Sequence, residues 1–267
     1  MEREPYAGLA TTFDTVAELY ERVRPRYPAA LFDDLALSAG PAPGARVLEI
    51  GAGTGQATRG LLERGWSVVA LEPGRELAAV ARRVLAGRGD VEVVVSPFEA
   101  WEPRDREPFD LVLAATSWHW LDQRTAFSRA ADLLRPGGSL AIVATEHVAP
   151  PDGDDFFRVV ERVYDEVGMG DGKGGPVPPE EVPAPDVAAM AGSGRFGQPI
   201  VHRYVTSREH TAEEYLALLS TYSGHIAATP QQRATLFAGI RELIAARPRG
   251  TVRKHELNLL QVARRTR

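Results

Sequence analysis

The sequence has no cysteine, and Lys173 and Lys254 are its only lysines among 267 residues. The absence of cysteine excludes disulfide bonds, thiolate metal sites and cysteine nucleophiles together. The six histidines are scattered, and no two of them have the close spacing of a metal-binding pair on a helix. We therefore expect no metal site in this protein.

Long apolar runs and basic blocks are also missing. No run approaches the roughly 20 residues that span a bilayer, and the charged start of the chain, residues 1–5, is unlike a signal peptide. The net charge is −5 and the pI is near 5.8, without a basic block that could follow a phosphate backbone. These absences predict a cytoplasmic protein with a small-molecule substrate, and with no membrane or nucleic-acid partner. They leave the oligomeric state unknown.

A glycine-rich stretch is the most informative feature that is present. The apolar run of residues 45–50 breaks into Gly51, Gly53 and Gly55, and helix-forming residues follow over 56–64. This order predicts a strand, a tight turn and a helix. Glycine suits such a turn because it adopts backbone angles closed to other residues, and because a missing Cβ lets a ligand approach the backbone amides. The stretch predicts a cofactor site.

The spacing of the glycines argues against a dinucleotide. The dinucleotide fingerprint is G-x-G-x-x-G, and Gln56 stands where that pattern has its third glycine. Glu49, at the end of the first strand, favours a ligand that carries an ammonium or a sulfonium over one that carries phosphates. Glu72 ends the next apolar run, 66–71, and lies 21 residues after Gly51. An acid in that position can accept both hydroxyls of a ribose.

These two stretches together resemble the first and second motifs of the class I S-adenosylmethionine-dependent methyltransferases. The resemblance implies an α/β fold: a Rossmann-like sheet of seven strands, the last one antiparallel, with helices on both faces and a small cap. It implies S-adenosylmethionine as the cofactor. The residues that it assigns to the cofactor are Tyr20, Arg24, Glu49, Gly51, Gly53, Gly55, Glu72, Pro73, Phe98, Glu99 and Ala114.

The segment before the first strand also resembles this family. Residues 1–12 are expected to be a flexible lead-in, and helical periodicity begins at Thr15. Residues 20–28 are similar to a "Tyr … Arg-Pro-x-Tyr-Pro" segment that closes over the amino-acid end of the cofactor. Arg24 would pair with the methionyl carboxylate and Tyr20 would donate a hydrogen bond there. The alternative is a solvated arginine beside two packing tyrosines.

Later strands are expected at 91–95, 109–115 and 139–144. After the strand at 91–95, Phe98 would pack on the adenine and Glu99 would accept from its amino group, while Trp101 belongs to the core. Asp110 is expected to support the end of the sheet and to take no part in the chemistry. An aromatic residue and an acid after a strand also occur by chance.

The stretch Trp118-His119-Trp120 follows the fourth strand. It resembles the "His-Trp" signature of methyltransferases related to the trans-aconitate enzyme. His119 is either a general base or a structural residue that holds the loop. We expect Trp118 to line the substrate pocket and Trp120 to lie in the core. Just after the fifth strand, His147 is the other candidate for the pocket.

The second half of the chain is harder to interpret. We expect helices over 154–167, 211–220 and 230–246, and strands over 199–206 and 251–262. The glycine- and proline-rich residues 168–198 form either a disordered loop or a lid over substrate. The whole chain, 1–267, would be a single methyltransferase domain. An N-terminal helical cap would cover about 15–38, and substrate-cap elements about 150–198 and 207–248.

The sequence therefore predicts a methyltransferase that acts on a metabolite. In such an enzyme the protein holds a nucleophile in line with the S–CH3 bond and excludes water. One alternative is a protein of the same fold that binds the cofactor for cyclisation, rearrangement or regulation. Another is a nicotinamide-dependent oxidoreductase, which the glycine spacing disfavours.

Overall fold

The structure is a computed structural model, and it describes residues 13–104, 107–170, 172 and 174–266. The lead-in expected over residues 1–12 lies outside these described residues. Within them, no helix is long and apolar enough to cross a membrane, and no group of three or more histidine, aspartate or glutamate side chains is placed to hold a metal ion.

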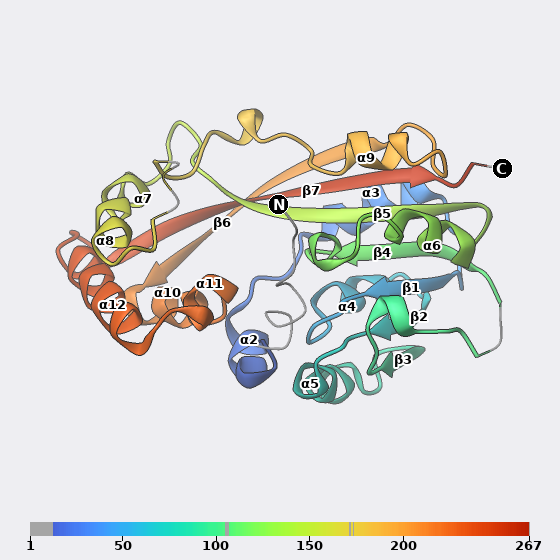
Figure 1. The fold of residues 1–267 in the computed structure, drawn as a ribbon, viewed down its shortest axis with the longest axis horizontal. Helices are drawn as coiled ribbons and strands as arrows, with labels where there is room; N and C mark the ends of the chain where they lie inside the picture. Colours follow the sequence, from blue (N-terminus) through green and yellow to red (C-terminus); the bar gives the residue numbers. More distant parts are fainter. Residues whose placement is uncertain (1–12, 105–106, 171, 173, 267) are drawn as a thin grey trace.

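One seven-stranded sheet runs through the molecule, in the order β3-β2-β1-β4-β5-β7-β6 (Figure 1). The strands β1 to β5 are parallel, whereas β7 is antiparallel to both of its neighbours. The predicted seven strands with an antiparallel last strand are confirmed. Their bounds are Arg46–Ile50 (β1), Ser67–Leu71 (β2), Val91–Val94 (β3), Phe109–Ala115 (β4), Leu134–Val148 (β5), Ile200–Thr211 (β6) and Thr251–Arg264 (β7).

Helices cover both faces of the sheet, which is why the central strands are apolar on both sides. On one face, α3 (Ala29–Ala39), α4 (Gln56–Leu62) and α5 (Arg75–Leu85) form a core with alternate residues of the strands. On the other face, α6 (Ala126–Leu133) and α9 (Val187–Gly192) pack with the remaining strand residues. The carboxyl ends of β1, β2 and β4 are thereby held at one rigid edge.

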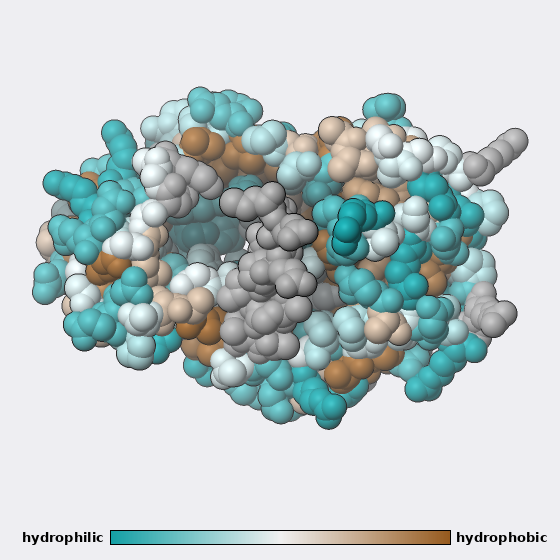
Figure 2. Space-filling view, viewed as in Figure 1, coloured by the Kyte–Doolittle hydropathy of each residue, from teal (hydrophilic) through white to brown (hydrophobic). Residues whose placement is uncertain are grey.

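A second group of helices, which we call the cap, surrounds the far end of the long strands β5, β6 and β7 (Figure 1). It consists of α7 (Phe156–Val159), α8 (Glu161–Glu166), α10 (Ala212–Leu219), α11 (Ser223–Ala227) and α12 (Pro230–Ala245). Side chains of α7, α10 and α12 form its own apolar cluster. Capping boxes begin α10 at Thr211 and α12 at Thr229, as these polar residues favour. Figure 2 shows the surface hollowed between the cap and the centre of the molecule.

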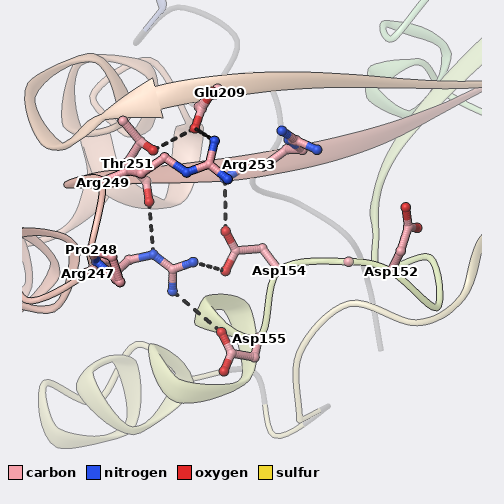
Figure 3. A pocket seen from close by; sticks show the side chains of 10 residues that line it. Asp152, Asp154, Asp155, Glu209, Arg247, Pro248, Arg249, Thr251 and Arg253 are labelled. Atoms are coloured by element: carbon pink, nitrogen blue, oxygen red, sulfur yellow. Dashed lines mark hydrogen bonds and ion pairs between the residues drawn. The ribbon is translucent and has the colours of Figure 1, made fainter.

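Polar contacts at the outer end of the cap tie α12, α7 and β7 together (Figure 3). Arg247 donates to Asp154 at 2.6 Å and to Asp155 at 3.5 Å. The hydroxyl of Thr251 donates to Glu209 at 2.7 Å. The acids and arginines at this end therefore largely neutralise one another.

The segment 168–198 differs from its expected form. It contains a 3-10 helix, Pro179–Glu181, and the helix α9, whose Met190 is fully buried on the sheet. The helix spans only one and a half turns, too few for a periodic apolar pattern to stand out. The last part of this segment therefore covers the sheet. The strand predicted over 139–144 is also longer, because β5 pairs with β7 as far as Val148.

At the N-terminal side, a 3-10 helix, Phe13–Val16, leads into α2 (Ala17–Val23). Pro25 and Pro28 separate α2 from α3, as the sequence predicts. The helix α2 packs against α5 of the sheet layer and α10 of the cap. It thus contacts both parts of the molecule.

Candidate functional site

The glycine loop lies at the carboxyl end of β1, and all three glycines have positive φ: 69° at Gly51, 59° at Gly53 and 91° at Gly55. A Cβ on Gly51 would lie 2.6 Å from the Cβ of Ser117, and one on Gly55 would lie 3.0 Å from Leu85. These two positions need glycine for close packing as well as for conformation. A Cβ on Gly53 would meet only the Tyr20 ring, at 3.8 Å, so the backbone at Gly53 is turned toward α2.

Glu72 follows β2 and is only 5% exposed. One carboxylate oxygen accepts from the Gly53 amide and the other from the Gly74 amide, both at 2.8 Å. Burial raises the pKa of this carboxyl, and the two amide hydrogen bonds partly offset that rise. Each oxygen keeps a lone pair. The carboxylate is thus fixed beside the loop and can still accept hydroxyl donors.

Glu49 lies within β1, and its carboxyl group contacts α4. It is 1% exposed and accepts from the Thr58 hydroxyl of α4 at 2.7 Å. Burial, with a contribution from Glu72, raises its pKa to about 8. The group is therefore mostly uncharged at neutral pH. In this structure Thr58 holds the Glu49 carboxyl group, and the assignment of Glu49 to the cofactor stays a prediction.

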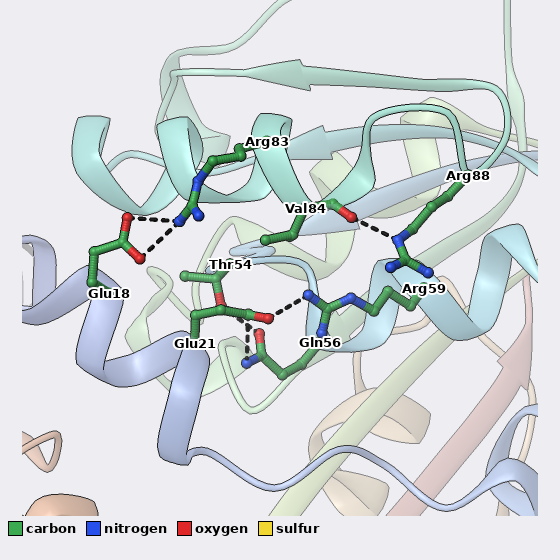
Figure 4. A network of polar contacts seen from close by, with 8 residues as sticks. All are labelled: Glu18, Glu21, Thr54, Gln56, Arg59, Arg83, Val84 and Arg88. Atoms are coloured by element: carbon green, nitrogen blue, oxygen red, sulfur yellow. Dashed lines mark hydrogen bonds and ion pairs between the residues drawn. The ribbon is translucent and has the colours of Figure 1, made fainter.

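Glu21 of α2 fixes this helix to the glycine loop, and no sequence motif pointed to it (Figure 4). Its carboxylate accepts from the Thr54 hydroxyl at 2.8 Å, from Gln56 at 3.3 Å and from the Arg59 guanidinium at 2.5 Å. Thr54 and Arg59 are both buried. A buried arginine needs an anionic partner, so Arg59, the one charged residue of α4, was the available signal.

Arg24 of the segment after α2 contacts groups of the cap. Its guanidinium donates to the hydroxyl and the carbonyl of Thr221, at 2.9 and 2.6 Å. It also lies over two rings, 4.8 Å from Tyr20 and 4.4 Å from Tyr222. These contacts join α2 to the cap. The Arg24 guanidinium group therefore binds other groups of the protein, and Tyr20 is one of the two rings that it contacts.

A chain of hydroxyls crosses the carboxyl ends of β4 and β5. The Tyr27 hydroxyl lies 2.8 Å from that of Thr116, which lies 3.1 Å from that of Thr145. Thr145 donates to Asn258 of β7 at 2.9 Å. Thr116 has φ of 57°, and among the described residues it is the one non-glycine with positive φ. Such strain at a strand end is typical of functional sites, and the sequence pattern did not reveal it.

The burial of the two tryptophans is the reverse of the predicted one. Trp118 is 1% exposed and packs against Phe127 in the core, with ring centroids 4.9 Å apart. Trp120 is half-buried and lies against Phe13 at 6.0 Å. The short 3-10 turn Trp118–Trp120 directs the two rings to different sides. Trp118 is therefore a core residue, and Trp120 is the ring near the N-terminal cap.

His119 is exposed and its ring lies 4.7 Å from that of Trp120. No hydrogen bond to another described residue is made by its imidazole. Protein atoms around the ring exclude part of the water, which lowers the pKa of the imidazole. A neutral imidazole at neutral pH is the form that can accept a proton.

The other residues assigned to the cofactor divide into buried and exposed ones. Phe98 is buried in the core, where Arg129 lies over its ring at 5.4 Å and donates to its carbonyl at 3.0 Å. Ala114 is fully buried in the centre of the sheet. Glu99 and Pro73 are exposed. Phe98 and Ala114 are thus part of the core in this structure, and their assignment to the cofactor stays a prediction.

His147 lies near the end of β5 and meets Phe157 of the cap edge to face at 4.3 Å. Its Nε2 is buried and has no partner among the described residues. Burial lowers the pKa of this histidine to about 3, with further contributions from Lys254 and His255. The ring is therefore neutral at pH 7. It lies on the same side of β5 as Thr145, because side chains two positions apart on a strand share a face.

Comparison with known proteins identifies relatives of this chain. The family model for a methyltransferase domain matches residues 48–142. An uncharacterized methyltransferase of Mycobacterium tuberculosis (strain H37Rv) is 40% identical over 139 residues, which is 51% of this chain and 52% of the relative. The chain thus spans about half the length of this curated relative. An uncharacterized methyltransferase of Geobacillus kaustophilus is 30% identical over 56% of this chain and 71% of the relative.

Solved structures agree with this fold. A putative type II methyltransferase from Anaeromyxobacter dehalogenans superposes with a TM-score of 0.63 at 25% identity, covering 90% of this chain and 97% of the other. A phosphoethanolamine N-methyltransferase of Haemonchus contortus, solved with S-adenosylhomocysteine, gives a TM-score of 0.52 at 18% identity, over 95% of this chain and 58% of the other. The latter likeness concerns the fold alone.

Proposed function

This chain belongs to the class I S-adenosylmethionine-dependent methyltransferases, and from this premise we propose that it transfers a methyl group from S-adenosylmethionine to a small molecule. The observation that carries the proposal is the arrangement of Glu72 at the glycine loop. A carboxylate with free lone pairs is fixed beside three positive-φ glycines, at the carboxyl edge of parallel strands. Ligands of open α/β sheets bind at that edge.

The residues present at the loop fit an adenosine cofactor. Glu72 can accept from two ribose hydroxyls while it keeps its bonds to Gly53 and Gly74. The backbone at Gly53 has no Cβ that would hinder an approaching ligand. When bound, S-adenosylmethionine supplies an electrophilic methyl group on a sulfonium.

The task of the protein in this reaction is positioning and exclusion of water. A lone pair of the substrate forms the new bond to the methyl carbon as the carbon–sulfur bond breaks, and the sulfur keeps that electron pair. Glu21 and Arg24 hold α2 between the loop and the cap, so that this helix closes one side of the site. The Tyr27, Thr116 and Thr145 hydroxyls provide polar groups at the ends of β4 and β5.

We assign His119 as the candidate general base. Its imidazole is exposed, has a lowered pKa, and is not held by a hydrogen bond to another described residue. A base is needed only when the nucleophile is a weakly acidic hydroxyl or carbon. His147 is assigned to the substrate pocket, together with Phe157 of the cap, whose ring it contacts. Two features support a small molecule as the substrate. The net negative charge of the chain disfavours a nucleic acid, and the cap lies near this edge of the sheet.

Calorimetric titration with S-adenosylhomocysteine, and with NAD as the control ligand, tests the cofactor. We expect saturable binding of the first and none of the second. Binding of NAD, or no binding of S-adenosylhomocysteine, would contradict the proposal. With binding established, a metabolite panel is screened by mass spectrometry for a product that has gained one methyl group. A product whose mass is unchanged, made only when the cofactor is present, would indicate rearrangement in place of methyl transfer.

A further inference from the structure

A cavity of about 240 Å³ lies where the N-terminal segment, the sheet and the cap meet. Pro25 and Arg26 form one wall, β6 and β7 form the floor, and Leu218 of α10 closes the side toward the cap. It is distinct from the larger cavity of about 520 Å³ at the outer end of the cap, where Arg247 is paired with Asp154 and Asp155 (Figure 3).

The charges of the smaller cavity are not balanced. Arg26, Arg208 and Lys254 supply three positive groups, and Glu256 is its one acid. Neither guanidinium group makes a hydrogen bond or an ion pair with another described residue. Lys254 is only 5% exposed and pairs with Glu256. A chain with a net charge of −5 thus gathers an excess of positive charge in one hollow.

A buried imidazole in the same wall lacks a partner. His210 is 4% exposed, and its Nδ1 has no hydrogen bond to the described residues. Burial, Arg208 and Lys254 lower the pKa of His210, so the ring is neutral and one nitrogen carries a proton. An unsatisfied buried polar group is costly unless a ligand or water completes it. This group and the buried Lys254 distinguish the cavity from an ordinary solvated surface.

Two segments that line the cavity also carry residues of the proposed site of methyl transfer. Arg26 directly precedes Tyr27, whose hydroxyl bonds to Thr116. On β7, Lys254, Glu256 and Asn258 alternate onto one face of the sheet, and Asn258 bonds to Thr145 at the other end of this row. Four residues of an extended strand span about 14 Å. A small molecule of that length would reach from the cavity to the hydroxyls at the end of β4.

We propose that this cavity binds an anionic oxyacid group of the substrate, a carboxylate or a phosphate, and so orients the other end of the substrate toward the methyl group. The orientation of the substrate toward the methyl group rests on the proposed function. Arginine forks and an ammonium group are the side chains that bind such oxyanions. The uncharged His210 adds a neutral donor. A substrate without an anionic group would leave the guanidinium groups of Arg26 and Arg208 and this donor without a ligand.

Nuclear magnetic resonance of the histidine side chains tests the proposal with simple anions. The chain has six histidines, so a spectrum of their Cε1–H groups is easily resolved, and His210→Gln identifies the His210 peak. Citrate and inorganic phosphate are added separately to protein saturated with S-adenosylhomocysteine, with sodium chloride at matched ionic strength as the control. We expect a saturable shift of the His210 peak with citrate, with phosphate, or with both; which anion acts tells carboxylate from phosphate.

Variants locate the site. Arg208→Gln changes an exposed side chain and should weaken anion binding about tenfold or more, and Lys254→Met should do the same if it folds. Arg253→Gln is the matched control, because Arg253 is the exposed neighbour of Lys254 on the opposite face of β7. No saturable shift of His210 with either anion, or equal losses in Arg208→Gln and Arg253→Gln, would overturn the proposal. Anion binding without S-adenosylhomocysteine binding would instead overturn the proposed function, and with it the assignment of the anion to a substrate.

Discussion

The Glu21 carboxylate lies 2.5 Å from the guanidinium of Arg59, and this ion pair joins α2 to the helix that follows the glycine loop. Both side chains are largely buried, so water cannot solvate either charge if its partner is removed. The same carboxylate holds the Thr54 hydroxyl within the loop. The position of α2 and the shape of the cofactor loop are therefore coupled through one residue.

Glu21→Gln should destabilise the protein by about 2–4 kcal/mol, because it leaves the buried Arg59 charge without an anionic partner. Denaturant unfolding measures the change. The double variant Glu21→Gln/Arg59→Met should recover much of the loss, since it removes both charges. Glu18→Gln is the control: its partner Arg83 is exposed, so stability should stay close to that of the unaltered protein. Equal effects of Glu18→Gln and Glu21→Gln would show that the burial of the pair is unimportant.

Glu72→Gln should weaken binding of S-adenosylhomocysteine by about 1–3 kcal/mol, the size of lost hydrogen bonds to a charged acceptor. The glutamine side chain would also point an N–H donor at one of the two backbone N–H groups, Gly53 or Gly74, that now donate to the carboxylate. Calorimetry measures the affinity. Glu99→Gln, which alters an exposed acid near the same edge, is the comparison and should change the affinity less. Unchanged affinity in Glu72→Gln would remove Glu72 from the cofactor site.

Glu49→Gln should stabilise the ligand-free protein at pH 7, by about 1–3 kcal/mol. The pKa of Glu49 rises from its ordinary value of 4.5 to about 8 in the folded chain. Between these two values the unfolded chain loses this proton and the folded chain keeps it, so the stability of the unaltered protein falls as the pH rises. The amide removes that dependence on pH while its oxygen still accepts from Thr58.

Unfolding of both proteins at a series of pH values measures this effect. The advantage of Glu49→Gln should vanish near pH 4.5 and should be largest above pH 8, the two ends of the titration. A variant that is less stable than the unaltered protein over the whole range would mean that the folded chain favours the ionised carboxylate.

His119→Ala should leave the affinity for S-adenosylhomocysteine within about threefold, which corresponds to less than about 0.7 kcal/mol. The imidazole is exposed and contacts Trp120, and no hydrogen bond joins it to the glycine loop, which lies wholly within the described residues. If His119 is the base, turnover falls while this affinity is kept, and the loss becomes smaller as the pH is lowered, because protonation of His119 then removes the base from the unaltered protein as well. A large loss of affinity would move His119 into the cofactor site.

Local patterns in the sequence predicted the sheet and the glycine loop well. Runs of apolar residues with glycine at their ends identify parallel strands, and positive φ at Gly51, Gly53 and Gly55 needs no distant information. The acid at position 72 was found for the same reason: its place depends on the end of a strand. The antiparallel direction of the last strand was predicted from the family resemblance.

Contacts between distant residues explain what the sequence could not predict. Glu21 and Arg59 are 38 positions apart, and Arg24 meets Thr221 across 197 positions. Which of Trp118 and Trp120 enters the core depends on a single turn of 3-10 helix, in which neither ring is favoured by periodicity. The exposed or buried state of such residues is decided by packing partners that are not adjacent in the chain.

The position of β7 has a consequence for the order in which the protein can fold during synthesis. β7 is the last of the described strands to be made, yet it lies between β5 and β6, and β6 pairs with no other described strand. Until residues 251–264 have left the ribosome, β5 has an open edge and β6 has none of the described strands to pair with. Open strand edges invite pairing with other chains, and such non-local closure is slow. The nascent protein therefore depends on β7 to cover the edges of β5 and β6, which are made before it.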